Sequence, residues 1–185
     1  MKKIEIFLLL FILIFSFGCS SSSETTQNNT QTSEISYITT NNLKVTIPSG
    51  WKEIKDNYEQ IYELWLVNDN SNASISFIPI ILNSELMEKS ETEKIELIKK
   101  IITTKRQNTA DEFELLSEQN MDSKYYMKSL QFIINNSIQN SIIFGDGKKY
   151  YECLAYFNKN YQPSDSEIEE LFSIQNTVVQ SSTIE

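Results

Sequence analysis

The sequence predicts a single α+β domain, in which an antiparallel β-sheet of about six or seven strands carries two helices packed on one face. Runs of alternating apolar residues are separated by links of hairpin length, which pair successive strands in antiparallel fashion. Two capping boxes, starting at Ser90 and Ser164, each open an amphipathic helical segment. The order of strands, long helix, strands and short helix is typical of an antiparallel sheet with its helices on one face.

The first strands precede the long helix. Residues 43–47 alternate apolar and polar side chains after the turn-forming pair 41–42, and residues 48–51 interrupt the strand with proline and glycine. Residues 61–67 and 73–82 are rich in β-branched and aromatic residues and flank a short polar stretch of turn composition. These two runs predict a second hairpin.

Both helices begin at a recognisable N-cap. Ser90 and Glu93 form the first capping box, and the isoleucines that follow recur at helical spacing, which predicts a helix over about 91–106. Ser164 and Glu167 form the second capping box and lead a closing helix of about ten residues. Between the helices, further strands are predicted over about 113–119, 124–134, 137–144 and 149–157.

The N-terminal residues have the pattern of an exported lipoprotein. Lys2 and Lys3 precede an apolar run of about half the roughly 20 residues that span a bilayer, and Gly18 stands before Cys19. The segment resembles the lipobox of bacterial lipoproteins, from which residues 16–17 depart. The resemblance implies cleavage before Cys19 and transfer of a diacylglycerol to its sulfur. An ordinary secretory signal, cleaved near Gly18 to leave a free thiol, is the alternative.

The expected organisation is a signal peptide (1–18), a lipidated cysteine with a polar tether (19–36), a single domain (37–179) and a disordered tail (180–185). The tether has too few apolar residues to fold. Acylated Cys19 would hold the protein on a lipid bilayer, because two or more acyl chains give stable anchoring. Ser20 is not the aspartate that retains enterobacterial lipoproteins at the inner membrane, so we expect the outer membrane in a cell envelope with two membranes.

Composition argues against several classes of function. The chain has 16 basic and 25 acidic residues and a net charge of -9, which disfavours a nucleic-acid partner because such binding needs basic residues. It contains no histidine, which removes Ser-His-Asp catalysis and His-ligated zinc. Once Cys19 is lipidated, Cys153 has no partner for a disulfide. We therefore expect no enzymatic activity, no cofactor and no metal site.

The domain also resembles a known superfamily. The strand 43–47 runs into Pro48 and then Gly50-Trp51, and residues 169–174 lie in the closing helix. These features and the order of elements resemble the PsbP-like superfamily, which includes small bacterial lipoproteins of the DcrB type. The resemblance covers about 35–179. It implies an accessory or assembly role without a known reaction, and it carries over no functional residues.

Aromatic side chains supply the candidate binding surface. The sequence has nine tyrosines, and tyrosine offers a large contact area with a polar tip. The residues expected to line a ligand or partner surface are Trp51, Tyr62, Trp65, Tyr126 and Tyr150. Two alternatives remain: Trp51 caps one end of the core, and strand propensity alone accounts for most of the tyrosines.

Three further features are interpreted as structural. Cys153 shares a strand face with aromatic residues and is expected to be a buried thiol, not a nucleophile. Glu112, Glu114 and Glu118 are expected on a solvated face, not at a calcium or acid–base site. Residues 145–148 are expected to form a hairpin turn, because a phosphate loop would need a different spacing and a following helix.

The sequence therefore favours a membrane-anchored, non-catalytic binding or assembly factor of a bacterial envelope that contacts an envelope protein. A small-ligand-binding lipoprotein, with a pocket between the helices and the aromatic sheet face, is the alternative. An enzyme that uses carboxylates, or tyrosine with lysine, is the third hypothesis.

Overall fold

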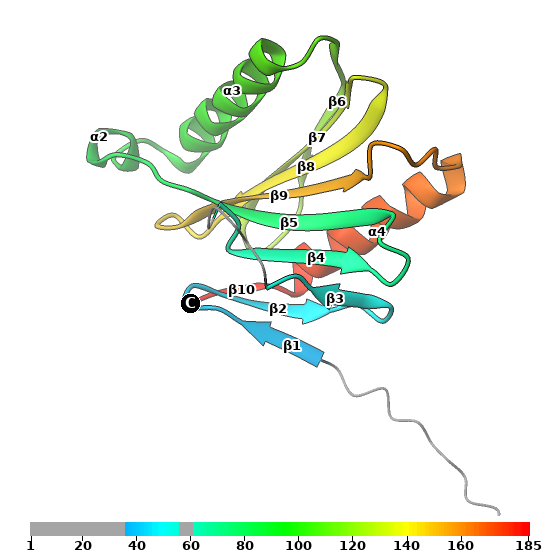
Figure 1. Ribbon diagram of the computed structural model, residues 1–185. Helices are drawn as coiled ribbons and strands as arrows, with labels where there is room; N and C mark the ends of the chain where they lie inside the picture. The colour runs from blue at the N-terminus through cyan, green and yellow to red at the C-terminus, as the bar shows by residue number, and fades with distance from the viewer. Residues whose placement is uncertain (1–35, 56–60) are drawn as a thin grey trace, which may run out of the picture. The chain divides into compact units, whose positions relative to one another are not determined.

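The computed structural model describes residues 36–55 and 61–185 (Figure 1). The expectations for the signal peptide and for Cys19 lie outside these described residues. The helices are α2 (Ser84–Met87), α3 (Glu91–Thr109) and α4 (Asp165–Ser181). The strands are β1 (Ser36–Thr39), β2 (Leu43–Ile47), β3 (Trp51–Glu53), β4 (Leu64–Asn68), β5 (Ala73–Ile80), β6 (Phe113–Met121), β7 (Tyr126–Ile134), β8 (Ser137–Gly145), β9 (Tyr150–Phe157) and β10 (Thr183–Ile184). In this part of the chain, no helix is long and apolar enough to cross a bilayer.

Seven strands form one antiparallel sheet in the order β3-β4-β5-β9-β8-β7-β6. Strands β1, β2 and β10 form a separate three-stranded sheet, also antiparallel. The tight turn between β7 and β8 places Asn135 and Asn136 at φ values of 48° and 64°, which suits a two-residue hairpin of the primed type. The seven-stranded antiparallel sheet confirms the predicted α+β fold class.

The two long helices lie on opposite faces of the seven-stranded sheet, which differs from the expected packing on one face (Figure 1). Ile142 and Phe144 of β8 pack in a core cluster that includes buried residues of α4. Ile143, between them, packs in a second cluster with three isoleucines of α3. Successive side chains of a strand point to opposite faces, so the consecutive apolar residues of β8 require a cover on both sides.

The C-terminal part of the chain is more ordered than predicted. Helix α4 has 17 residues, where about ten were expected, because Val178 and Val179 extend its buried face to exposures of 1% and 0%. Thr183 and Ile184 then pair with β2 as strand β10. The expected disordered tail over 180–185 is therefore wrong: these residues end a helix and add a strand to the small sheet.

Candidate functional site

The five residues predicted to line a surface lie in three separate places. Trp51 is half-buried and packs against the core cluster on the α4 side of the sheet. Trp65 points to the opposite face, because its neighbours in β4 pack in the α4-side cluster, and its ring lies 5.6 Å from that of Tyr62. Tyr126 and Tyr150 lie near the N-terminal end of α3. These side chains therefore do not form one continuous surface.

Tyr126 lines a cleft of 530 Å³ between the first turns of α3 and the loop that joins β6 to β7. Tyr126 is 56% exposed. The cleft is also lined by residues of both charges, among them Glu96, Asp122, Lys124 and Lys128. An exposed tyrosine surrounded by charged groups is suited to contact another molecule.

Tyr150, by contrast, is a structural residue. It is 2% exposed, and its hydroxyl donates a hydrogen bond to the carboxylate of Glu91 in α3. Burial and then this carboxylate raise the pKa of Tyr150 above its ordinary value. Gly145 packs closely against its ring: a Cβ at that position would stand 2.4 Å from the ring carbon Cδ1. Tyr150 therefore ties the β8–β9 turn to α3.

A network of ion pairs borders the Tyr126 cleft. The side chain of Lys128 is 5% exposed, and its Nζ contacts the carboxylates of Glu96 and Glu118. Lys99 contacts the same two carboxylates at 2.8 and 3.1 Å. Hydrogen bonds from Lys128 and then from Lys99 lower the pKa of both glutamates, which keeps them ionised. Glu118 is thus engaged in an ion network, and is unsuited to acid–base catalysis.

The other candidate carboxylates are solvated, as predicted. Glu112 and Glu114 are exposed. Within the described ranges, no group of three side chains is placed to hold a metal ion.

Trp51 lines a second cleft, of 360 Å³, on the α4 side of the sheet. Its other lining residues include Tyr161, Glu167 and Glu170. The carboxylate of Glu167 accepts hydrogen bonds from the hydroxyls of Tyr161 and Ser164, which lower its pKa to about 2. That carboxylate is therefore already engaged in capping α4. Trp51, which packs against the core cluster, agrees with the alternative interpretation that it caps one end of the core.

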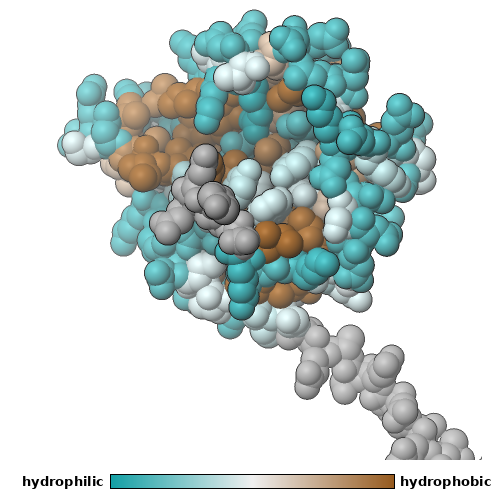
Figure 2. Space-filling model, viewed as in Figure 1, coloured by the Kyte–Doolittle hydropathy of each residue, from teal (hydrophilic) through white to brown (hydrophobic). Residues whose placement is uncertain are grey.

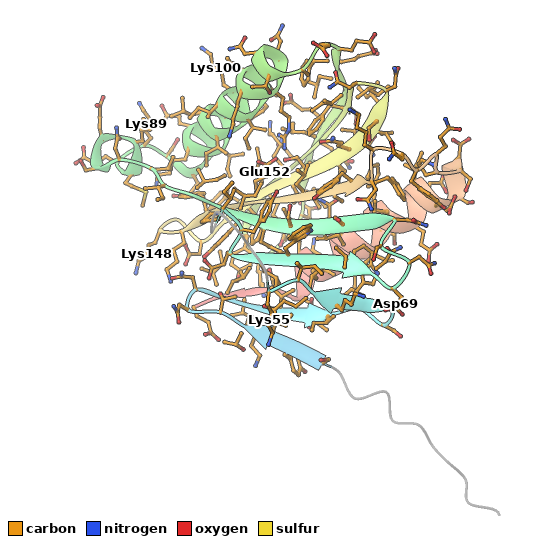
Figure 3. The ribbon with its side chains drawn as sticks, in the orientation of Figure 1. Lys55, Asp69, Lys89, Lys100, Lys148 and Glu152 are labelled. Atoms are coloured by element: carbon orange, nitrogen blue, oxygen red, sulfur yellow. The ribbon has the colours of Figure 1, made fainter. Side chains whose placement is uncertain are left out.

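Sequence reasoning missed a polar group buried between α3 and the sheet. The guanidinium of Arg106 donates to the carboxylate of Glu152, which also accepts from the Ser141 hydroxyl at 2.6 Å. The Arg106 guanidinium carbon lies 4.4 Å from the ring centroid of Phe132. Glu152 is 6% exposed and lies on β9, on the face of the sheet that α3 covers (Figure 3). The position of Glu152 within an otherwise largely apolar strand was the sequence feature that could have indicated a buried ion pair.

Two structural interpretations are confirmed. Cys153 is fully buried, and burial raises the pKa of its thiol. Gly145 ends β8 and residues 146–148 lie in the turn to β9, where the Asp146 carboxylate accepts from the backbone N–H groups of Lys148 and Lys149 at 2.8 Å each.

Neither the known family patterns nor the curated proteins include a match to this sequence. Solved structures do match its fold. The solution structure of cyanobacterial PsbP (CyanoP) from Synechocystis sp. PCC 6803 aligns with a TM-score of 0.60 at 10% identity, over 90% of this chain and 99% of that chain. The crystal structure of LpqN, involved in cell envelope biogenesis of Mycobacterium tuberculosis, aligns with a TM-score of 0.49 at 12% identity, over 77% and 82%. The similarity to CyanoP shows that the fold is PsbP-like.

Proposed function

We propose that this chain is a lipoprotein of a bacterial cell envelope, anchored by acylated Cys19, whose domain is a non-catalytic binding or assembly factor. The lipobox-like sequence that ends at Cys19 supports the anchor, and the polar residues after it would let the domain reach a partner. The PsbP-like fold supports an accessory role. In a cell with two membranes, we propose the outer membrane as its location.

The observation that carries the binding role is the exposure of Tyr126. Its ring stands in a cleft with charged residues around it and is 56% exposed. The ion pairs of Lys128 hold one wall of this cleft in place, since they join α3 to β6 and β7. Rigid aromatic side chains with a polar tip supply much of the binding energy at protein interfaces. We propose that an envelope protein docks at this cleft.

The docking proposal predicts a selective loss of contact. Tyr126→Ala should lose a cross-linked partner in native membranes, whereas Tyr37→Ala should keep it. Tyr37 is a matched control because it is 54% exposed but lies on β1, in the other sheet. Circular dichroism would check that both variants fold. Repeated recovery of no partner, or equal loss from both variants, would contradict the proposal.

The anchor is tested separately by intact-mass analysis of protein extracted from its own host membranes. We expect a mass that corresponds to cleavage before Cys19 plus acyl chains, and no acylation of a Cys19→Ser variant. An unacylated wild-type mass would remove the anchor. It would not affect the docking proposal at Tyr126, which is tested independently by the cross-linking experiment.

A further inference from the structure

Strand β6 forms one edge of the seven-stranded sheet, and no described strand pairs with its outer side. It has nine residues, whereas β3 at the opposite edge has three. Residues 114–120 of β6 are exposed without interruption. Such an edge presents a row of backbone N–H and C=O groups that are free to pair with another extended chain. The length of this exposed edge makes it a candidate site for a further strand.

The side of β6 that faces α3 is apolar in its first half. Phe113 packs in the α3-side cluster, and Leu115 lies opposite Phe132, a fully buried residue of the same cluster. Because residues opposite each other on neighbouring strands point to the same face, Leu115 extends this apolar surface to the edge, where it is 40% exposed. Figure 2 shows apolar residues gathered on the face that α3 covers, with hydrophilic side chains above them. A strand added to β6 would bury apolar side chains on this face.

The other side of β6 carries negative charge. Glu114 stands between Phe113 and Leu115 in the strand, so its exposed side chain points to the opposite face. Residues 111–122, which contain β6, include five acidic residues and no basic residue. An added strand with a basic side chain beside Glu114 gains stability, because cross-strand pairs of opposite charge attract. Two copies of β6 side by side would instead repel each other.

We propose that β6 binds an extended segment of a partner protein, which joins the sheet as a further strand. The segment alternates apolar side chains toward α3 with basic side chains toward Glu114. Backbone hydrogen bonds attach it, and the alternation determines which segments fit. Of β6, only Asn120 and Met121 line the cleft at Tyr126, so this site and the docking cleft are separate assignments. The competing explanation is that the acidic residues and the bulge of β6 only protect the edge from pairing.

The experiment titrates the ¹⁵N-labelled full chain with the blocked peptide Thr-Lys-Val-Lys-Val-Lys-Thr and follows the backbone amide signals by NMR. Two matched peptides replace the lysines by glutamate or the valines by proline. Proline keeps the charge but removes backbone N–H groups that an added strand needs. We expect saturable shifts of the β6 signals with the lysine peptide alone. Hydrogen exchange should slow at alternate residues of β6, because these direct their N–H groups to the free edge.

Glu114→Lys should weaken binding of the lysine peptide about three- to tenfold, because it turns an attractive cross-strand pair into a repulsive one. Glu169→Lys is the control, since it makes the same change of charge at an exposed residue of α4 and should keep the wild-type affinity. Tyr126→Ala should also keep that affinity, so a failure of the docking cleft would leave this site unaffected.

Three results would overturn the proposal. The absence of saturation up to about 1 mM peptide would show that the acidic edge only prevents pairing. Equal binding of the proline peptide would exclude strand addition, and equal binding of the glutamate peptide would exclude the charge preference. Slow exchange of the outward amides in the free chain, if it increases with protein concentration, would assign the edge to a second copy of this chain.

Discussion

Gln175 shows how one polar side chain can fix a helix to a sheet. It lies on the apolar stripe of α4 and is 0% exposed. Its amide donates to the carbonyl oxygens of Asn140 and Cys153 at 3.0 and 2.7 Å, and accepts from the Asn140 side chain at 2.7 Å. The helical spacing of the neighbouring apolar residues indicates that position 175 is buried. Its partners could not be predicted, because they depend on the placement of α4 over β8 and β9.

Replacement of Gln175 by leucine should destabilise the domain by about 2–4 kcal/mol, since it leaves buried groups of Asn140 and Cys153 without partners. Urea unfolding at neutral pH would measure the change. Gln180→Leu is the control, because Gln180 is exposed and makes only a long contact, of 3.4 Å, with a backbone oxygen. Similar losses in both variants would show that the buried hydrogen bonds of Gln175 contribute little.

Gly145 is required by close packing. A Cβ there would lie 2.4 Å from the Tyr150 ring and 2.7 Å from the carbonyl oxygen of Lys149. We therefore expect Gly145→Ala to cost roughly 2–4 kcal/mol of unfolding free energy. Gly50→Ala provides a comparison, because Gly50 has a φ of 77° but only an ordinary contact at 3.7 Å, and should cost about 1 kcal/mol. Calorimetry on both variants would decide, and a larger loss at Gly50 would exclude crowding as the dominant effect.

The candidate site was only partly predictable at this scale. Tyr126 could be named from the sequence, because tyrosine offers a large contact area with a polar tip. The buried group of Arg106, Ser141 and Glu152 could not, since its members come from α3, β8 and β9 and meet only through strand register and helix placement. Tyrosine content alone also could not separate exposed Tyr126 from buried Tyr150.

At the scale of elements, local signals predicted where helices begin better than where they pack. Both capping boxes form as expected, with each serine accepting from the backbone N–H three residues later. The side on which each helix packs depends on the sheet. The consecutive apolar residues 142–144 of β8 need a cover on both faces of the sheet, whereas the short links between strands led to the prediction of both helices on one face.

The ion network between α3 and strands β6 and β7 predicts a pH dependence. The pKa values of Glu96 and Glu118 are lowered in the folded protein from the ordinary value of 4.5. Their contribution to stability is therefore present above that value and is lost as the pH falls through the lowered pKa values. In Lys128→Met, the unfolding free energy should fall less than in the wild type when the pH drops from about 6 to about 3. The substitution removes the main hydrogen-bond donor that lowers the pKa values of Glu96 and Glu118. The two carboxylates are 43% and 37% exposed, so solvent keeps the effect small.

Urea unfolding at both pH values would measure this difference. Lys105→Met is the control, since Lys105 is an exposed lysine of the same helix, α3. If Lys128→Met loses as much stability on acidification as the wild type, other carboxylates account for the loss at low pH.

Over the whole molecule, the small sheet joins the beginning and the end of the described domain. Strand β2 pairs with β1 on one side and with β10 on the other. Leu43 and Val45 of β2 are fully buried in the same cluster as α4. The first and last strands are therefore tied to the main core through β2, in a different sheet from β7, which carries Tyr126 (Figure 1).

Strand β1 should stabilise the domain only modestly. It makes four register pairs with β2, and Ile38 packs against the main core while the other three residues of the strand are exposed. We expect a chain that begins at Leu43 to melt about 3–6 °C below one that begins at Ser33, which corresponds to a loss of about 1–2 kcal/mol. A chain that begins at Ser36 keeps β1 and should melt with the longer one. Equal melting of all three chains would show that β1 is an extension of the tether, whereas unfolding of the shortest chain would make β1 an essential part of the core.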